Sequence, residues 1–585
     1  MRWMLSVLLV LFSLLALPVL PALPAQGSTP PVRFAVIADQ TGGPVPGVYD
    51  SVLAEVARMD PDFIVTVGDQ LGGYMGADTA GLRAEYDALA TQYDRAFGPR
   101  WRTGDFLILT PGNHDITDDR AEPLWRQRVG PPSRRVDVLG VTVLVLDTSR
   151  GREGGLAPEA LHWLEAELAH IPPERPVIVA THKPFFNGGV WRDAEDPAHR
   201  LFVQHGVDAV LAGHWHTYVY DPRGGVTYAV CGSSGGVTDG SGLANGEFVG
   251  FIWGTVRDGR ITLTPISKGA VLAPDIVNAT ENRARNDFER RGLILSPFNL
   301  AKRTGYITVT THNTGDIQTS DSLRWTVPPN WTVVPQTLPF VANAGESSVG
   351  EFELKCTDSP FPLPSISARI QFGRGKSVTA STLLRMDRAA QCPSADNITV
   401  DGGLSDGEWT ASPPETLFMS ADGGRSKVDP TEFFFAHNDR GLFLAARCRV
   451  AADHPVVADV SQHDGGIAGE DCVGWFLAPS DTVLYQIYVS PRAVVLDGRG
   501  IVRDGGDAEM DYGWNADYQV ASTRGREQWS VEMFVPYETI GARTETERSG
   551  LRLNIRRKQP ALKSNADWVP VSFDPTRLGR LELRE

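Results

Sequence analysis

Polar side chains of the kinds that bind metal ions follow several apolar runs in the first half of the chain. In chain order they are Asp39, Asp69, Asn113, His114, Asp115, His182, His214 and His216. Each stands at or just beyond the end of a run that is typical of a β-strand. The carboxyl ends of strands in an open α/β sheet meet in one crevice, so residues far apart in sequence are predicted to lie together.

The donor types in this set indicate a metal centre. Carboxylate and amide oxygens combined with imidazole nitrogens favour Zn, Fe, Mn or Co over calcium. The candidates are too many for one tetrahedral ion, but they suit two ions that share a carboxylate. Two ions roughly 3.5–4 Å apart can hold both the attacking and the leaving oxygen of a phosphoryl transfer. Taken singly, each Asp or Asn is more often a cap or turn residue.

The elements that would position these residues alternate between strand and helix. Strand-like runs cover Arg33–Ala38, Asp62–Val67, Asp105–Thr110, Val141–Leu146, Val177–Ala180, Val207–Ala212 and Val226–Val230. Apolar residues recur at helical spacing over Leu82–Phe97 and, after Pro158, over Leu161–Leu168. This alternation predicts an α/β fold with buried strands. Phe251–Val256 and Ile261–Ile266 predict a closing hairpin.

Five short motifs resemble those of the calcineurin-like metallophosphoesterase family in their order and approximate spacing. They are Asp39, Gly68-Asp69, Gly112-Asn113-His114-Asp115, Thr181-His182 and Gly213-His214-Trp215-His216. The resemblance covers about residues 33–270 and implies a layered α/β/β/α sandwich. It also implies a hydrolase of phosphomonoesters or phosphodiesters that uses a metal-activated hydroxide. The implied cofactor is a pair of divalent or trivalent ions, with Mn, Fe or Zn preferred.

The resemblance implies a role for each candidate ligand. Asp69 would bridge the two ions, and Asp39 and His216 would bind the first ion. The ligands of the second ion would be Asn113, His182 and His214. One motif departs from the family pattern, because Thr41 stands where the family usually has a histidine. That position is open to Gln40, Thr41 or water, or else the first site binds its ion weakly.

The same resemblance implies two catalytic residues. His114 would face the substrate, where it would stabilise phosphoryl charge or protonate the leaving oxygen. Asp115 would orient the ring of His114. The alternative hypothesis is a non-catalytic extracellular protein that binds a glycan or a surface and has a degenerate metal site. The intact His114-Asp115 pair and the complete second set of ligands favour the hydrolase.

The rest of the chain has a β-rich pattern. We predict a catalytic domain at 31–270, a connector at 271–290, an Ig-like β-sandwich at 291–390 and a second β-sandwich at 394–585. The last segment resembles family 9-like carbohydrate-binding modules at Asp401-Gly402, Leu404, Asp406, Trp409, Asn438–Leu442, Trp529–Pro536 and Leu553–Arg557. This resemblance implies a carbohydrate or cell-wall ligand. Trp409, Trp475 and Trp529 could stack on sugars, but the large area of a buried Trp favours a core position for each.

The ends and the bulk properties of the sequence set further limits. Residues 1–25 predict a signal peptide, hence a secreted or periplasmic protein without a membrane anchor after cleavage; an uncleaved anchor is the alternative. The net charge of -16 comes from dispersed acidic residues, which argues against a nucleic-acid-binding surface. In an exported chain, Cys356–Cys392 and Cys448–Cys472 could be disulfides, with Cys231 free; buried thiols are the alternative.

Overall fold

The computed structural model describes residues 30–73, 79–117, 121–150, 156–186, 196–238, 242–404, 407–502, 507–570 and 573–585. The chain splits into two compact units, and each is described by itself. The first is Met1–Gly73 with Thr79–Ile276, and the second is Tyr74–Asp78 with Val277–Glu585. The predicted signal peptide and Asp406 lie outside the described residues. Within the described ranges, no helix is both long and apolar enough to cross a membrane.

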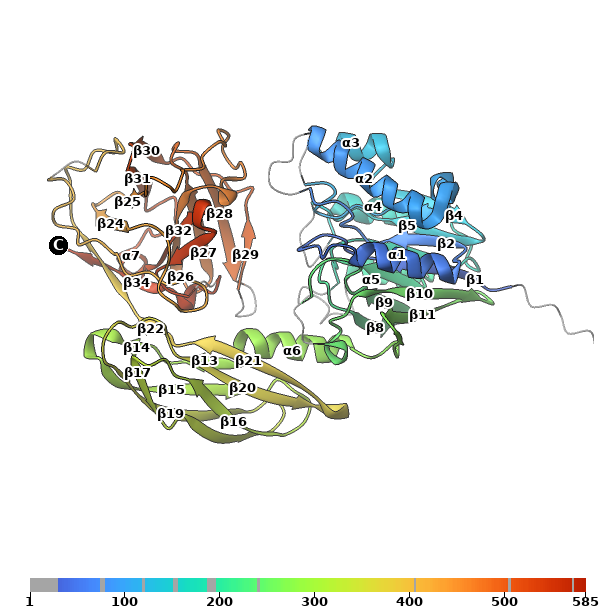
Figure 1. Cartoon of the computed structure of the whole chain (residues 1–585), viewed down its shortest axis with the longest axis horizontal. Helices are drawn as coiled ribbons and strands as arrows, with labels where there is room; N and C mark the ends of the chain where they lie inside the picture. The colour runs from blue at the N-terminus through green and yellow to red at the C-terminus, as the bar shows by residue number, and fades with distance from the viewer. Residues whose placement is uncertain are drawn as a thin grey trace, which may run out of the picture. The chain divides into compact units, whose positions relative to one another are not determined.

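Two six-stranded sheets form the centre of the first unit (Figure 1). One sheet has the order β12 (Ala270–Val271), β11 (Arg260–Ser267), β10 (Gly250–Arg257), β1 (Val32–Ile37), β2 (Phe63–Thr66), β3 (Leu107–Ile108). The other has the order β4 (Arg134–Val138), β5 (Val141–Val145), β6 (Val177–Ala180), β7 (Ala209–Ala212), β9 (Val226–Val230), β8 (Val219–Arg223). One core cluster joins residues of both sheets, including Val36, Val65, Val143 and Ile178. The two sheets therefore pack face to face.

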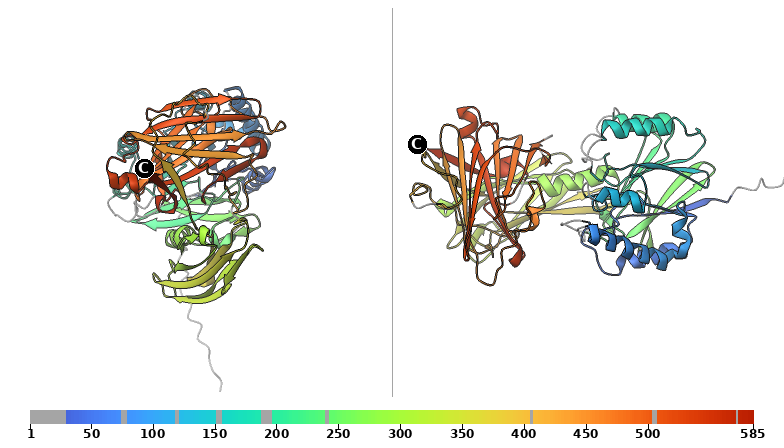
Figure 2. Two further views of the ribbon diagram at one scale, coloured as in Figure 1. Left: turned by 90° about the vertical axis from the view of Figure 1, so that its left-hand side faces the viewer. Right: turned by 90° about the horizontal axis from the view of Figure 1, so that it is seen from above.

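Helices connect the parallel strands of both sheets. α1 (Val48–Met59) links β1 to β2, α2 (Thr79–Phe97) links β2 to β3, α4 (Pro158–Leu168) links β5 to β6, and α5 (Pro197–His205) links β6 to β7. The short α3 (Ala121–Arg128) precedes β4. Figure 2, in its view from above, shows blue helices on one side of the strands and cyan helices on the other. This is the predicted α/β/β/α layering.

The local sequence explains where two of these helices form. Leu82, Tyr86 and Leu89 recur at helical spacing along α2, and all three are buried. The N-terminus of α5 is fixed by Asp196, whose carboxylate accepts the backbone N–H groups of Ala198 and His199. Asp196 is followed by proline at the first helical position, so the start of α5 has both usual signals. Helices α1, α3 and α5 were not predicted.

The second unit begins with the helix α6 (Ala279–Arg291), which lies in the predicted connector. An Ig-like sandwich follows. One sheet has the order β13 (Leu293–Leu295), β15 (Thr304–His312), β19 (Ser347–Cys356), β17 (Trp331–Val334). The other has the order β18 (Thr337–Ala342), β16 (Thr319–Thr326), β20 (Ser365–Phe372), β21 (Lys376–Leu383). Burial alternates along β19, where Phe352 and Leu354 enter the shared core. This alternation is typical of a two-layer antiparallel sandwich.

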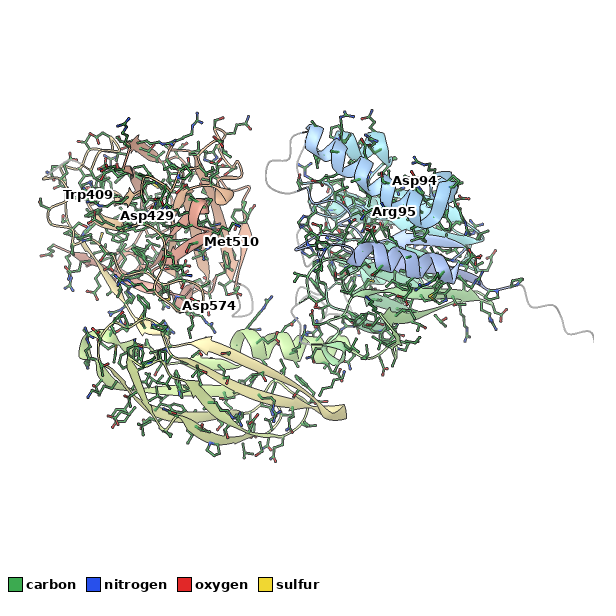
Figure 3. The ribbon with its side chains drawn as sticks, in the orientation of Figure 1. Asp94, Arg95, Trp409, Asp429, Met510 and Asp574 are labelled. Carbon is green, nitrogen blue, oxygen red and sulfur yellow. The ribbon has the colours of Figure 1, made fainter. Side chains whose placement is uncertain are left out.

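A second sandwich ends the chain. Its larger sheet contains β23 (Ala389–Pro393), β34 (Gly579–Arg584), β32 (Arg552–Gln559), β26 (Cys472–Ser480), β27 (Val483–Val489), β28 (Val495–Val502), β29 (Ala508–Asp511) and β33 (Ser564–Asp567). The smaller contains β24 (Thr431–His437), β25 (Gly441–Arg449), β31 (Gln528–Pro536) and β30 (Gln519–Arg524). Trp475 and Trp529 are fully buried between them. Trp409, labelled in Figure 3, is also buried and donates from its indole nitrogen to Glu532. All three Trp residues therefore belong to the core.

The cysteines do not form the disulfides considered from the sequence and are instead buried thiols. All five are free thiols, and all five are buried. Cys448 on β25 and Cys472 on β26 belong to different sheets. Burial raises the pKa of each of these two thiols to about 12, so both stay protonated.

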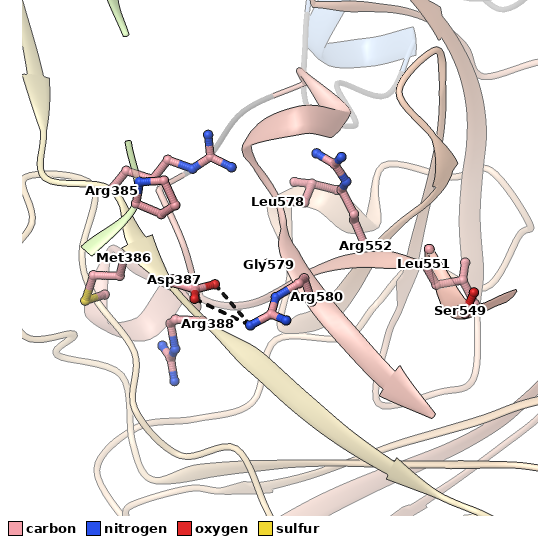
Figure 4. A pocket seen from close by; sticks show the side chains of 12 residues that line it. Arg385, Met386, Asp387, Arg388, Ser549, Leu551, Arg552, Leu578, Gly579 and Arg580 are labelled. Carbon is pink, nitrogen blue, oxygen red and sulfur yellow. Dashed lines mark hydrogen bonds and ion pairs between the residues drawn. The ribbon is translucent and has the colours of Figure 1, made fainter. Parts of the chain in front are cut away.

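A pocket of about 350 Å³ lies where the linker between the two sandwiches passes (Figure 4). Four of its lining residues are Arg385, Arg388, Arg552 and Arg580. Three of these guanidinium groups form ion pairs: Arg388 with Glu415, Arg552 with Asp481 and Arg580 with Asp387. The linker strand β22 (Met386–Asp387) pairs with β14 (Phe298–Asn299) on the Ig-like side. Because its charges are largely paired, we interpret the pocket as a structural junction.

Candidate metal centre

The predicted site residues stand at the carboxyl ends of five strands from both sheets of the first unit. Asp39 follows β1, Asp69 follows β2, and Asn113, His114 and Asp115 follow β3. His182 follows β6, and His214 and His216 follow β7. Contacts between these segments bring the ends of the two sheets together.

The closest cluster is formed by Asp69, Asn113, His182 and His214. Asp69, His182 and His214 each offer one ligand atom, and these atoms lie within 4.8 Å of one another. His182 Nε2 is 3.2 Å from Asp69 Oδ2 and 3.0 Å from Asn113 Oδ1. The ring centroids of His182 and His214 are 5.0 Å apart. The residues predicted to surround the second ion, with the predicted bridging carboxylate, therefore converge.

Asp39 and His216 form the neighbouring part of the site. His216 Nε2 is 3.4 Å from Asp39 Oδ1. The backbone N–H of His214 donates to the same carboxylate at 3.1 Å. Asp39 is fully buried, so the carboxylate joins two segments that are distant in sequence inside the protein.

Backbone carbonyls fix which nitrogen of two histidines faces the site. His182 Nδ1 donates to the carbonyl oxygen of Val67 at 2.8 Å, and His216 Nδ1 donates to that of Val237 at 2.6 Å. Each Nε2 therefore faces a carboxylate oxygen, an arrangement that needs either a proton or a cation between the two atoms. Burial lowers the pKa of His182, but Asp69 and Asp39 raise it by more, to about 9. The donor set and its orientation fit a bound metal ion.

The position of Asp115 corrects the predicted role of this residue. Its carboxylate accepts four backbone N–H groups, those of Asp69, Gln70, Leu71 and Gly112, at 2.8–2.9 Å. It does not orient the ring of His114. Burial and the charge of Asp69 raise the pKa of Asp115 to about 7. Asp115 instead holds the turn that carries Asp69 against the segment after β3.

The ring of His114 is oriented by a backbone carbonyl. Its Nδ1 donates to the carbonyl oxygen of Gly72 at 2.8 Å, and its Nε2 is 3.8 Å from Asp69 Oδ2. The His114 side chain is 20% exposed, whereas the Asp69 side chain is 4% exposed. His114 therefore lies on the accessible side of the buried carboxylate, as a residue that faces substrate would.

The backbone around the site is tightly constrained. Asp69, His214 and His216 all have positive φ, at 58°, 73° and 56°. Such conformations cost about 1–3 kcal/mol each and are concentrated at functional sites. Gly68 also has a positive φ, and a Cβ there would lie 2.4 Å from His182 Nδ1. The glycine before Asp69 is therefore required for the close approach of His182.

Several supporting residues were missed from the sequence. The Thr148 hydroxyl accepts the backbone N–H groups of His182 and Lys183, at 3.2 and 2.9 Å. Gln70 accepts the hydroxyls of Tyr49 and Tyr93 and donates to the Gly68 carbonyl. These residues hold backbone rather than ligand atoms, so no motif marks them.

The glycine-rich turn at 232–236 packs against the segment that carries Asp39. The carbonyl oxygen of Asp39 accepts the backbone N–H groups of Ser234, Gly235 and Gly236 at 2.9–3.2 Å. A Cβ on Gly236 would lie 2.5 Å from the ring of His216. The turn therefore supports Asp39 and His216 from behind.

Gln40 and Thr41 lie in the segment where the family usually has a histidine ligand. Gln40 donates its side-chain amide to Gln92 at 3.1 Å, in α2. Thr41 is buried, and its backbone N–H points to the carbonyl of Asp69 at 3.4 Å. The amide oxygen Oε1 of Gln40, the atom that could bind an ion, is buried without a hydrogen-bond partner among the described residues, so Gln40, Thr41 and water all remain candidates for this coordination position.

Comparison with known families supports the predicted resemblance. Residues 32–218 match the family model of calcineurin-like phosphoesterases. The first unit is thus a domain of the metallophosphoesterase type, and the family prediction is confirmed for this part of the chain. A search of curated proteins gives no match.

Three solved structures are similar to parts of this chain. A putative carbohydrate-binding protein from Bacteroides uniformis is 15% identical, with a TM-score of 0.28, covering 34% of this chain and 99% of that chain. A family 9 carbohydrate-binding module from Caldicellulosiruptor kristjanssonii in complex with cellotriose is 10% identical (TM-score 0.24; 34% and 94% covered). A purple acid phosphatase from yellow lupin (Lupinus luteus) seeds is 13% identical (TM-score 0.32; 42% and 52% covered).

Proposed function

We propose that this chain is a secreted, metal-dependent phosphoesterase that hydrolyses a phosphomonoester or phosphodiester. The observation that carries the proposal is the convergence of Asp69, Asn113, His182 and His214. His182 Nε2 lies 3.0–3.2 Å from oxygens of the first two, beside the partly exposed His114. In this proposal each candidate metal ligand and His114 keeps the role that the family resemblance implies, and only the role of Asp115 changes.

The protein groups divide the work between holding charge and moving a proton. Bound divalent ions would supply positive charge to the phosphoryl oxygens and lower the pKa of a coordinated water. Asp39 and Asp69 would provide anionic ligands, with His182, His214 and His216 presenting neutral nitrogens. His114, whose Nδ1–H donates to the Gly72 carbonyl, would in its imidazolium form donate the second proton, on Nε2, to the leaving oxygen and so become neutral.

His114→Ala tests the catalytic proposal without removing a proposed ligand. We expect kcat for an aryl phosphate ester to fall by about 10²–10⁴-fold, since general acid catalysis contributes that much. Metal content, measured by elemental analysis, should not change. The matched control is His170→Ala, because His170 is an exposed histidine whose Nδ1 contacts the backbone of its own turn. If the metal-loaded wild type hydrolyses neither monoesters nor diesters, the non-catalytic alternative replaces this proposal.

The alternative of an incomplete metal site is favoured by Thr41, which stands where the family usually has a histidine ligand. Thr41→His should restore the usual family ligand and strengthen binding of the first ion by at least about tenfold. Calorimetric titration with Mn²⁺ should then show a second tight ion per chain. Thr41→Val is the matched control: if it weakens the same ion, the Thr41 hydroxyl itself is a ligand. An unchanged isotherm in Thr41→His would show that a side chain at position 41 does not reach the first ion.

The remaining parts of the chain support a targeting role in the proposal. Residues 1–25 have the pattern of a signal peptide, and residues 394–585 carry the motifs that resemble carbohydrate-binding modules. Because Trp409, Trp475 and Trp529 are buried, sugar binding would have to use other side chains, such as the 46% exposed Tyr512. We therefore propose a glycan or cell-wall ligand for this module without assigning its binding face.

A further inference from the structure

A second group of metal-type donors lies in the C-terminal sandwich. His463, Asp464 and Asp497 each offer one ligand atom, and these atoms lie within 4.8 Å of one another. His463 and Asp464 belong to the loop before β26, whereas Asp497 lies on β28. The backbone N–H of Asp464 donates to the carbonyl of Val495 at 3.0 Å, which holds the loop against the start of β28.

Asp497 has an oxygen that nothing described in the chain satisfies. The residue is fully buried. Its Oδ2 accepts the backbone N–H of Ala516 at 3.1 Å, but Oδ1 has no hydrogen-bond partner among the described residues. His463 Nε2 faces this oxygen at 3.8 Å, which is too long for a hydrogen bond. A buried carboxylate oxygen without a partner is costly, so this one points to a ligand.

The surroundings of this oxygen are negative. Within the part of the chain that the structure describes, neither Asp464 nor Asp497 forms an ion pair with Lys or Arg. The only ionic contacts of these carboxylates there are with His463, at 3.3 Å from Asp464 and 3.8 Å from Asp497. The hydroxyl of Tyr518 is a neutral neighbour of the Asp497 carboxylate and brings no positive charge to it. Two carboxylates with one imidazole thus lack a compensating cation.

We propose that His463, Asp464 and Asp497 bind a divalent cation of the Zn²⁺ or Mn²⁺ class. One imidazole nitrogen with two carboxylates favours such ions over Ca²⁺, which prefers oxygen ligands alone. Zn²⁺ needs ligands at about 2.0–2.2 Å, so the side chains must close slightly on the ion. The side chains of His463 and Asp464 are 46% and 30% exposed and have room to move, whereas Asp497 is fixed.

The ion would join the loop before β26 to strand β28. It would satisfy Asp497 Oδ1 and neutralise the pair of carboxylates, with water completing the coordination. The competing explanation is a protonated His463 that bridges Asp464 and Asp497 without any metal. The two explanations differ in whether Zn²⁺ binds, which makes them separable by titration.

Calorimetric titration of the full chain with Zn²⁺ at neutral pH tests the proposal. The background carries His182→Ala, His214→Ala and His216→Ala, so that both candidate ions of the first unit lose histidine ligands. We expect one Zn²⁺ per chain, at least about tenfold weaker binding in Asp497→Asn, and weaker binding of Ca²⁺ than of Zn²⁺. The control Asp422→Asn changes an exposed carboxylate that caps a turn elsewhere in the sandwich, and it should leave the isotherm unchanged.

The opposite results are equally specific. Absence of Zn²⁺ binding, or binding that Asp497→Asn and His463→Gln both leave unaltered, overturns the proposal. Tighter binding of Ca²⁺ overturns the assigned class of ion. If circular dichroism shows that Asp497→Asn does not fold, His463→Gln decides, because that side chain is nearly half exposed. None of these outcomes depends on phosphoesterase activity.

Discussion

Replacing His182 by alanine is expected to abolish both binding of the second ion in the first unit and hydrolysis of phosphate esters. His182 Nε2 contacts Asp69 and Asn113, and no other described side chain occupies that position. Removal of one such group should lower kcat by about 10³-fold or more, because the charge that stabilises the transition state is lost with the ion. Hydrolysis of an aryl phosphate ester and elemental analysis of the purified variant measure the two effects.

The control for this variant is His199→Ala. His199 is a partly buried histidine of the same unit that contacts the hydroxyl of Tyr228 rather than the site. It should keep its metal and its activity. A His182→Ala protein that retains both would show that the cluster around Asp69 is structural, and the proposed function would then fail.

Asp115→Ala should have a large effect on stability rather than on chemistry alone. The variant leaves four backbone N–H groups in the interior without their carboxylate acceptor. Hydrogen bonds to a charged group contribute about 1.5–3 kcal/mol each, although such losses are not additive. We expect the free energy of unfolding of the first unit to fall by about 3–5 kcal/mol, as measured by urea titration.

Asp208→Ala provides the comparison for Asp115. The carboxylate of Asp208 accepts one hydrogen bond, from the backbone N–H of Val177 at 2.8 Å, and lies outside the candidate site. Its loss should cost no more than one such bond, about 1.5–3 kcal/mol, and leave metal binding intact. If Asp115→Ala instead keeps full stability and loses only kcat, the ring-orienting role first predicted for Asp115 would be restored.

The sequence carried most of the fold of the first unit because its signals are local. The apolar runs Val177–Ala180 and Val226–Val230 became strands with the predicted ends. Residues at strand ends were also predictable as a group, because chain direction places the ends of parallel strands together. His182 and His214 could thus be paired from sequence although they come from different strands.

The parts that could not be predicted depend on contacts between distant backbone segments. The partners of Asp115 are amides in the segment 69–71 and at Gly112, and no side-chain pattern reveals that arrangement. The same reason hides Thr148, which accepts backbone N–H groups of the segment that carries His182. The orientation of His114 depends on the carbonyl of Gly72, which any residue type would supply.

The carbonyls of Val67 and Val237 have a consequence for how an ion would enter the site. They hold the rings of His182 and His216 by hydrogen bonds that involve no metal. The coordination sphere is therefore preorganised by ordinary strand ends and turns, and an incoming ion need not order the polypeptide. Chelation should empty such a centre while leaving the surrounding sandwich folded and ready to be reloaded.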